Sequence, residues 1–359
     1  MRNRRDFLKH SAISASAFFL SQTGALASCG QTTNQKKEAE DSPYFKVRGL
    51  NIGWDSQKML DWPTLAHEAG VNLLAVTVSG TVSGSDPWKK FLADCRKYDI
   101  QVENHQHALS SLLPRKLFEE DPSMFRMDEN GKRTPDFNCC PSSAKALDII
   151  ATNALKNAKD YPSTTGRYFF WQHDDGKMCN CPADKELSAS DQLLIVENAI
   201  IRKLREDNSS NTLAHLAYYD TIPAPSKIKP EEGIFLQYAP FERTWDYPIS
   251  DPNAKKAGKD IINIEYLHHL DENLKLFPAE TAEILEYWLD VSMFSSWTQP
   301  AVKLPWKKEI FLSDIASYAK RGIRDIVSYV IYVDQDYMKM YKDIGFIYEY
   351  GQELKNYRV

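Results

Sequence analysis

Two adjacent carboxylates follow an apolar run in the stretch HDDG at residues 173–176. Asp174 and Asp175 would lie at the C-terminal end of a strand, where Gly176 permits a tight turn. Two carboxylates held close together do not ionise independently, so one is expected to keep a proton near neutral pH. Such a pair could provide the proton donor and the second carboxylate that glycosidic bond cleavage requires. The alternative is an ordinary turn whose aspartates cap a helix or contact solvent.

Histidines mark the end of an earlier apolar run, in ENHQH at residues 103–107. His105 and His107 are two residues apart and would share one face of a strand, with Glu103 on the same face to orient an imidazole. Together with His173, these side chains could bind sugar hydroxyls or a metal ion. For the cluster at a strand end, ligand contact is the favoured interpretation.

A further pair of acids occurs in EYWLD at residues 286–290. Glu286, Trp288 and Asp290 would lie on one face of a seventh strand, with the two carboxylates roughly 13 Å apart. That separation is too large for both acids to serve one reacting bond, and Asp290 would lie nearer the functional end. An ordinary amphipathic face is an equal alternative.

Aromatic side chains crowd the predicted loops and strand ends. Flat rings pack against the C–H faces of sugars while nearby polar groups bind the hydroxyls, so this composition is typical of carbohydrate sites. The candidates are Trp54, Trp171, Tyr219, Tyr238, Trp245, Trp288, Trp297 and Trp306.

The cysteines form two close groups, Cys139–Cys140 and Cys179–Cys181. They match a zinc site only weakly, because the usual two-residue spacer is absent and adjacent cysteines rarely point at one ion. In a protein outside the cytoplasm, a disulfide between the two groups is the better expectation.

The fold that positions these side chains is predicted from eight apolar, strand-like runs that alternate with helical patterns. This alternation predicts a parallel sheet, and eight units predict a single (β/α)8 barrel of the TIM type with its chemistry at the C-terminal strand ends. The fifth crossover lacks a clear helix, and the seventh run could begin as a helix instead of a strand. The eight runs are residues 45–53, 71–78, 100–105, 167–173, 213–219, 233–239, 283–291 and 323–333.

Residues 1–28 are typical of an export signal. Arg4 and Arg5 resemble a twin-arginine motif, and LASC before and at Cys29 resembles a lipobox. We therefore expect lipidation of Cys29, a tether over residues 29–43 and a folded domain over residues 44–359, attached through the lipid to a membrane at the periplasmic or the cell-surface side. Removal of the signal changes the formal net charge from -5 to -8, which argues against nucleic-acid or anionic-membrane partners.

Several blocks of the sequence resemble the bacterial family called domain of unknown function 4838. They are HALSSLLP at residues 107–114, CCPSSA at 139–144, HDDGKMCNC at 173–181 and EYWLDVSMFSSW at 286–297. The family is common in polysaccharide-degradation loci of Bacteroidota. Its characterised members, which resemble glycoside hydrolase family 163, are endo-β-N-acetylglucosaminidases that act on N-glycans.

The resemblance implies a retaining glycosidase for glycans that contain N-acetylglucosamine, with no cofactor. Asp174 would orient the substrate's acetamido group, Asp175 would protonate the leaving oxygen, and Asp290 or Glu286 would be the alternative partner. This chain departs from the family's usual pattern by having Asp174 in place of an asparagine and Asp184 in place of a third cysteine. It also lacks extra domains that many members carry, so its substrate could differ.

Two other functions are compatible with the sequence. A metal-dependent hydrolase would use His105, His107, His173 or His215 with Asp334 after the last strand, although such barrels usually place a histidine pair on the first strand. A non-catalytic glycan-binding lipoprotein would bind an oligosaccharide and leave it intact.

Overall fold

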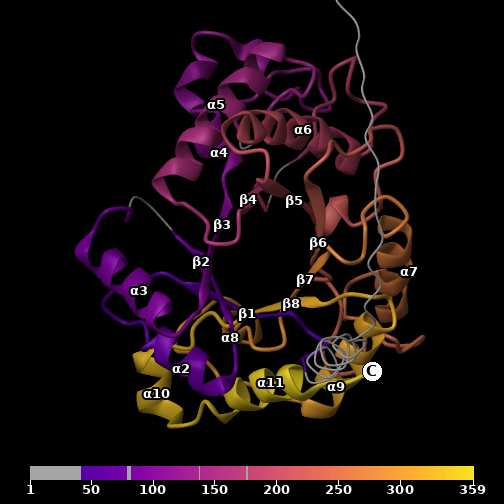
Figure 1. The fold of residues 1–359 in the computed structure, drawn as a ribbon. Coiled ribbons are helices and arrows are strands. Elements are labelled where there is room, and N and C mark those ends of the chain that lie inside the picture. The colour runs from indigo at the N-terminus through magenta and orange to yellow at the C-terminus, as the bar shows by residue number, and fades with distance from the viewer. Residues whose placement is uncertain (1–41, 79–81, 137, 175–176) are drawn as a thin grey trace, which may run out of the picture. The chain divides into compact units, whose positions relative to one another are not determined.

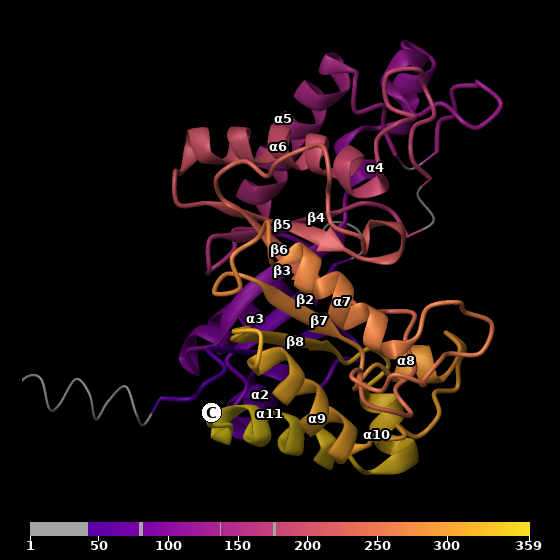
Figure 2. The ribbon, with the colours of Figure 1, turned by 90° about the vertical axis from the view of Figure 1, so that its right-hand side faces the viewer.

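The computed structural model describes residues 42–359, apart from residues 79–81, 137 and 175–176. Eight parallel strands pair in chain order and close into a barrel, with β8 beside β1. Figure 1 looks into this ring of strands, and Figure 2 shows the helices packed outside it. The predicted (β/α)8 fold is confirmed. The strands are β1 (Val47–Gly53), β2 (Leu73–Thr77), β3 (Gln101–His107), β4 (Arg167–Trp171), β5 (Thr212–Ala217), β6 (Ile234–Tyr238), β7 (Glu283–Glu286) and β8 (Asp325–Tyr329).

The helices expected between the strands form, and polar residues start several of them. Each of these N-cap side chains accepts a hydrogen bond from a backbone N–H in the first turn, which satisfies an otherwise unpaired donor. The N-caps are Asp61 for α2 (Trp62–Ala69), Ser85 for α3 (Asp86–Lys97), Ser143 for α5 (Ala144–Asp160) and Ser188 for α6 (Ala189–Asp207). The other helices are α4 (Leu109–Leu112), α7 (Asn263–Asn273), α8 (Val291–Phe294), α9 (Lys308–Ala319), α10 (Gln335–Tyr341) and α11 (Gly345–Asn356), with 3-10 turns η1 (Arg115–Phe118), η2 (Pro122–Met124) and η3 (Tyr219–Thr221).

The crossover from β5 to β6 contains only the short turn η3, as its sequence indicated. A buried carboxylate in the first turn of α6 holds this crossover in place. Asp191 Oδ1 accepts the backbone N–H groups of Ser226, Lys227 and Ile228 at 2.9, 2.8 and 2.9 Å. These three charge-assisted hydrogen bonds fix the position of the crossover, as the packing of a helix does for other crossovers of the barrel.

The seventh run does form a strand, β7, but this strand ends at Glu286, before the end of the predicted run. The chain then turns, and Asp290 becomes the N-cap of α8. Trp288 and Asp290 therefore do not share a strand face with Glu286, as the alternating pattern had suggested. The short apolar run after Glu286 does not distinguish a strand from the turn that follows it.

A largely buried arginine joins three strands at the N-terminal end of the barrel. Arg167 Nη1 of β4 lies 2.9 Å from Asp325 Oδ2 of β8 and 3.5 Å from Glu283 Oε2 of β7. The C-terminal helix closes the ring on the outside, where the Tyr350 hydroxyl donates to the Gly49 carbonyl of β1 at 2.8 Å. No helix in the described part of the chain is both long and apolar enough to span a bilayer.

Candidate active site

The C-terminal strand ends surround a cavity of about 440 Å³. This is the end of a (β/α)8 barrel where catalytic groups are found. Two carboxylates, one imidazole, four tyrosines and several apolar rings line it. The side chains that matter below are His107, Trp171, Asp174, Tyr218, Tyr219, Phe241, Tyr287, Asp290, Ser292, Trp297 and Tyr329.

Asp174 lies at the rim, in the loop that leaves β4, and its side chain is 51% exposed. Its Oδ1 is 3.3 Å from His107 Nε2 of β3. The other ring nitrogen of His107, Nδ1, contacts the carbonyl of Gln172 and must donate to it, because a carbonyl only accepts. The contact between Nε2 and Oδ1 then needs a proton of its own, on either the imidazole or the carboxyl group. Asp174 and His107 therefore form a hydrogen-bonded pair at the rim.

Asp290 enters the cavity from the loop after β7 and is almost fully buried. Its Oδ1 accepts the Ser292 hydroxyl at 2.6 Å and the backbone N–H groups of Ser292 and Met293 at 3.0 and 3.3 Å. Burial raises the pKa of Asp290 to about 6, and these three hydrogen bonds oppose the rise. The position of Asp290 is thus fixed by its capping role, while its proton is retained at mildly acidic pH.

Two stacked tyrosines connect the two carboxylates. The rings of Tyr287 and Tyr329 lie 5.0 Å apart with an interplanar angle of 22°. Burial is the main cause that raises the pKa of both phenols, and the charges of Asp174 and Asp290 raise it further. Both carboxylates are therefore close enough to this tyrosine pair to affect its ionisation. Tyr218 is also close to Asp174, which adds to the effect of burial in raising its pKa.

These tyrosines were missed from the sequence, although a signal was present. Tyr218 and Tyr287 come directly after β5 and β7, and Tyr329 is the last residue of β8. Functional residues of such barrels lie at the C-terminal ends of the strands, and this rule, which pointed to Asp174 after β4, applies equally to these tyrosines. Aromatic residues at such positions are easily assigned to the core instead.

Three aromatic residues proposed from the sequence line the cavity: Trp171, Tyr219 and Trp297. Trp171 is fixed by its Nε1, which donates to Gln237 Oε1 at 2.7 Å. Tyr219 and Trp297 are 40% and 58% exposed, and the ring of Phe241 lies between them, 5.4 and 6.1 Å from theirs. The cavity therefore has an apolar wall that continues to the surface.

His105 lies in the barrel interior and does not line the cavity. Asn51 donates to its Nδ1 at 3.2 Å, because the amide oxygen of Asn51 already accepts from Thr77. His105 Nε2 then donates to Glu103 Oε2 at 3.2 Å. Burial lowers the pKa of His105 to about 3, so the ring is neutral and structural at physiological pH.

Glu286 and Trp288 are also held in the core, outside the cavity. Glu286 pairs with Arg243 at 3.1 Å and accepts from Trp245 Nε1 at 3.0 Å. Trp288 Nε1 donates to Asp314 Oδ2 at 2.9 Å. Asp290 is therefore the carboxylate of EYWLD that reaches the cavity, together with Tyr287.

Trp54 and Tyr238 lie elsewhere as well. Trp54 packs edge-on against Trp88, with ring centroids 4.9 Å apart. The Tyr238 hydroxyl is buried and donates to the Tyr266 carbonyl at 2.5 Å. Both were proposed as sugar contacts, and both are placed by packing with neighbouring helices.

The histidines suggested for a metal-dependent hydrolase do not converge. His173 and His107 have ring centroids 6.3 Å apart, but His215 is buried against Glu197, with its Nδ1 2.6 Å from Oε2. Asp334 caps α10. In the described part of the chain, the group able to hold a metal ion consists of Cys140, Cys179, Cys181 and Asp184.

Several predicted residues lie outside the described residues. They include Asp175, the proton donor expected from the sequence, and the N-terminal Arg4, Arg5 and Cys29. Their roles stay predictions.

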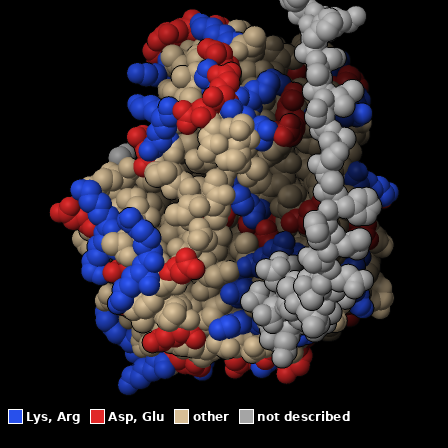
Figure 3. All heavy atoms as spheres, in the orientation of Figure 1, with Lys and Arg blue, Asp and Glu red and all other residues tan. Residues whose placement is uncertain are grey.

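Charge on the described surface is mixed. On the face drawn in Figure 3, acidic and basic side chains alternate around the edge, and uncharged residues fill much of the centre.

The sequence was also compared with known proteins. A family model described as domain of unknown function (DUF4838) matches residues 31–278. The comparison with curated proteins found no match.

Among solved structures, a GH20 module of the pneumococcal exo-β-D-N-acetylglucosaminidase StrH gives a TM-score of 0.46 at 8% identity, covering 90% of this chain and 86% of that one. The endo-β-1,4-mannanase of Thermotoga petrophila gives 0.46 at 9% identity, covering 87% and 77%. The group IV chitinase of Ostrinia furnacalis gives 0.43 at 9% identity, covering 86% and 100%. These scores carry no information on substrate or mechanism.

Proposed function

The chain belongs to the DUF4838 family, and from this premise we propose that it is a glycoside hydrolase acting on glycans that contain N-acetylglucosamine or related sugars. The observation that carries the proposal is the pairing of two unlike carboxylates in one aromatic-lined cavity. Asp174 is half exposed beside an imidazole, whereas Asp290 is buried and has its pKa raised to about 6. Glycosidic cleavage needs two carboxyl groups at one site, of which one holds a proton to donate.

The proposed mechanism is retaining and substrate-assisted. Asp174 orients the acetamido group of the sugar, whose oxygen attacks the anomeric carbon, and the bond to the leaving oxygen breaks. Asp175, next in the sequence, donates the proton to that oxygen, and Asp290 is the alternative donor because it holds a proton at mildly acidic pH. Water then opens the cyclic intermediate and returns the proton to the carboxylate.

The aromatic groups would bind the sugar. The stacked rings of Tyr287 and Tyr329 offer a flat apolar surface, and their hydroxyls keep their protons because burial raises their pKa. A protonated phenol can donate a hydrogen bond to an oxygen that gains negative charge in the transition state. Trp297 and Tyr219 at the open edge would contact sugar units further along the chain.

The test is digestion of a panel of N-glycans and chito-oligosaccharides, followed by mass spectrometry. Hydrolysis by the full-length protein should fall by about 10²–10⁴-fold in Asp174→Asn and in whichever of Asp175→Asn and Asp290→Asn removes the donor. Asp86→Asn, an exposed position on α3, is the control and should retain wild-type turnover. Binding of an oligosaccharide without cleavage of any panel member would favour a non-catalytic glycan-binding protein.

A further inference from the structure

Three thiols and a carboxylate meet in the interior, between the loop after β3 and the loop after β4. Their ligand atoms all lie within 4.8 Å of one another, and all four residues are buried. Cys140 Sγ and Cys181 Sγ are 3.8 Å apart. Asp184 Oδ2 is 3.2 Å from the first of these sulfurs and 3.1 Å from the second.

These separations match the edges of a tetrahedron around a small ion. Zinc–sulfur bonds of about 2.3 Å at tetrahedral angles place two sulfurs about 3.8 Å apart, and the shorter zinc–oxygen bond brings an oxygen closer than that to each sulfur. A disulfide, by contrast, requires two sulfurs about 2 Å apart and would use only two of the groups. The five described cysteines beyond Cys29 are all free thiols, so the disulfide expected from the sequence is not formed.

The charge of Asp184 also points to a cation. Its side chain is 0% exposed, and within the described residues it has no salt bridge to a lysine, arginine or histidine. Its partners are the Ser142 hydroxyl and the thiols of Cys140 and Cys181. A buried carboxylate without a salt-bridge partner is costly, and an ion held by the adjacent thiols would supply a positive charge in direct contact with it.

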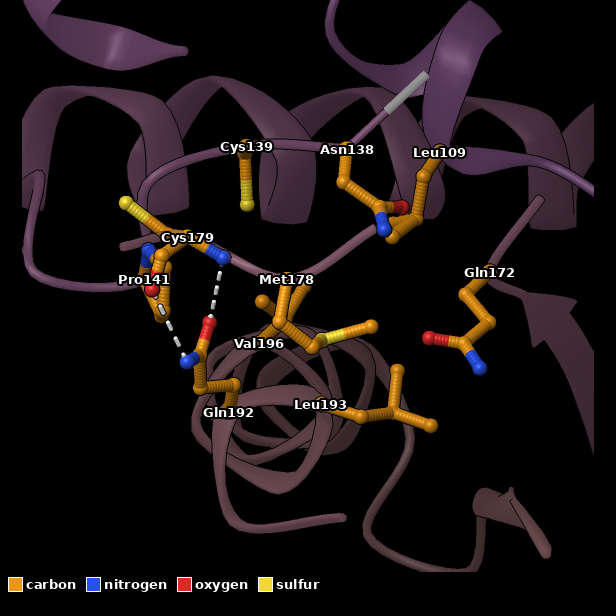
Figure 4. A pocket seen from close by; sticks show the side chains of 10 residues that line it. All are labelled: Leu109, Asn138, Cys139, Pro141, Gln172, Met178, Cys179, Gln192, Leu193 and Val196. Carbon is orange, nitrogen blue, oxygen red and sulfur yellow. Dashed lines mark hydrogen bonds between the residues drawn. The ribbon is translucent and has the colours of Figure 1, made fainter. Parts of the chain in front are cut away.

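Groups around the cluster hold its members in position. Met127 N–H donates to Cys179 Sγ at 3.4 Å, and Arg133 Nη1 lies 3.7 Å from the same sulfur. The amide of Gln192 accepts the Cys179 N–H at 2.9 Å and donates to the Cys179 carbonyl at 3.1 Å (Figure 4). It also donates to the Asp184 carbonyl at 3.0 Å. Such outer contacts to ligand sulfur and ligand backbone are typical of structural metal sites.

We propose that Cys140, Cys179, Cys181 and Asp184 bind one structural Zn²⁺ ion. A set of three thiolates and one carboxylate favours zinc over magnesium or calcium, and four protein ligands leave no position open for substrate. Cys139 is not part of this group of ligand atoms; its thiol lies among the residues that line the neighbouring apolar pocket (Figure 4).

The ion would fix the loop that carries Asp174 to the long loop after β3. Hydrogen bonds outside the ligand group also join these loops: Asn138 Nδ2 donates to the Lys177 carbonyl at 2.9 Å, and Asn180 N–H donates to the Met127 carbonyl at 2.8 Å. The proposal does not rest on the glycosidase assignment, since the site would be structural in an enzyme or in a binding protein.

The test measures metal in the full-length protein purified under reducing conditions without chelator. Elemental mass spectrometry should find zinc equimolar with the chain. Cobalt exchanged into the site should give the visible d–d bands of tetrahedral Co²⁺ and a near-ultraviolet thiolate charge-transfer band. Absence of zinc together with failure to take up cobalt would overturn the proposal, as would a disulfide that joins Cys140 to Cys179 or Cys181 in non-reducing peptide maps.

Matched variants assign the ligands. Cys140→Ala and Cys181→Ala should lose the bound metal, whereas Cys139→Ala, a buried neighbour outside the cluster, should keep it. Retention of equimolar zinc by both ligand variants would exclude these residues. If a ligand variant does not fold, the cobalt spectrum of the unmodified protein still decides between a thiolate site and none.

Discussion

Asp174 and Asp290 show how one cavity can hold two carboxylates in different surroundings. Asp174 is half exposed and lies 3.3 Å from the imidazole of His107. Asp290 is enclosed, and desolvation outweighs the three hydrogen bonds that it accepts. The difference comes from burial at the two strand ends and not from residue type.

The pH dependence of activity should follow Asp290 if this residue donates the proton. A carboxyl group with a pKa of about 6 is protonated below pH 6 and loses its proton above it, so kcat/KM should fall as the pH rises through about 6. Ser292→Ala removes a hydrogen bond that lowers the pKa of Asp290 and should move this fall to higher pH. In Asp290→Asn the fall should vanish along with most of the activity. A profile that is the same in all three proteins would assign the donor role to another residue.

The sequence could identify strand-end acids but not their burial. Asp174 and Asp290 were found because each comes at or soon after the end of an apolar run. Glu286 shares the alternating pattern, yet it is drawn into the core by Arg243, a residue more than forty positions away along the chain. Local spacing carries no information on such a distant partner.

At the scale of elements, the fifth crossover is held against the barrel by hydrogen bonds instead of by the packing of a helix. A crossover without a helix has little apolar surface to bury against the strands. Asp191 compensates by accepting three consecutive backbone N–H groups from that crossover. The absence of the helix could be predicted from the sequence, but the carboxylate that takes its place could not, because it belongs to the preceding helix.

Asp191→Ala should destabilise the protein by about 3 kcal/mol, since it leaves buried backbone donors without an acceptor. Urea unfolding at neutral pH would measure this loss. Asp207→Ala, at the exposed end of the same helix, removes only a surface ion pair with Lys159 and should cost about 0–1 kcal/mol. Equal effects of the two substitutions would contradict the role given to Asp191.

The stabilisation by Asp191 should also depend on pH. Burial acts to raise its pKa, but the N–H groups of Ile228 and Lys227 outweigh burial and hold the pKa below its ordinary value. A carboxyl group with a lowered folded-state pKa stabilises the protein above the unfolded-state pKa of about 4, and the stabilisation is lost as the pH falls through the folded-state value. The difference in unfolding free energy between the wild type and Asp191→Ala should therefore shrink in acid.

At the scale of the whole molecule, the closed barrel could be predicted because strand-like and helical patterns alternate along the folded domain. What the pattern could not supply is the set of contacts across the ring. Arg167 of β4 reaches β7 and β8 through the barrel interior, and its partners Glu283 and Asp325 are far from it in the sequence. Pairings of this kind arise only once the ring has closed.

Arg167→Met should lower the free energy of unfolding by about 3–5 kcal/mol, because it leaves two buried carboxylates without their cation. Arg202→Met, which breaks an exposed pair with Glu231, is the matched control and should change stability by about 0–1 kcal/mol. Calorimetric unfolding would measure both. A small effect at Arg167 would mean that the carboxylates take up protons at little cost.

The contacts of the last strand and the last helix bear on how this protein can be divided. The family match stops at residue 278, yet β7, β8 and α11 all come later. A fragment trimmed to the matched segment would leave β6 and β1 as bare edges, prone to pair with other chains, and would discard Asp290 and Tyr329. The matched part of this sequence is therefore not a self-sufficient folding unit, because the ring closes only when β8 is present to pair with β1.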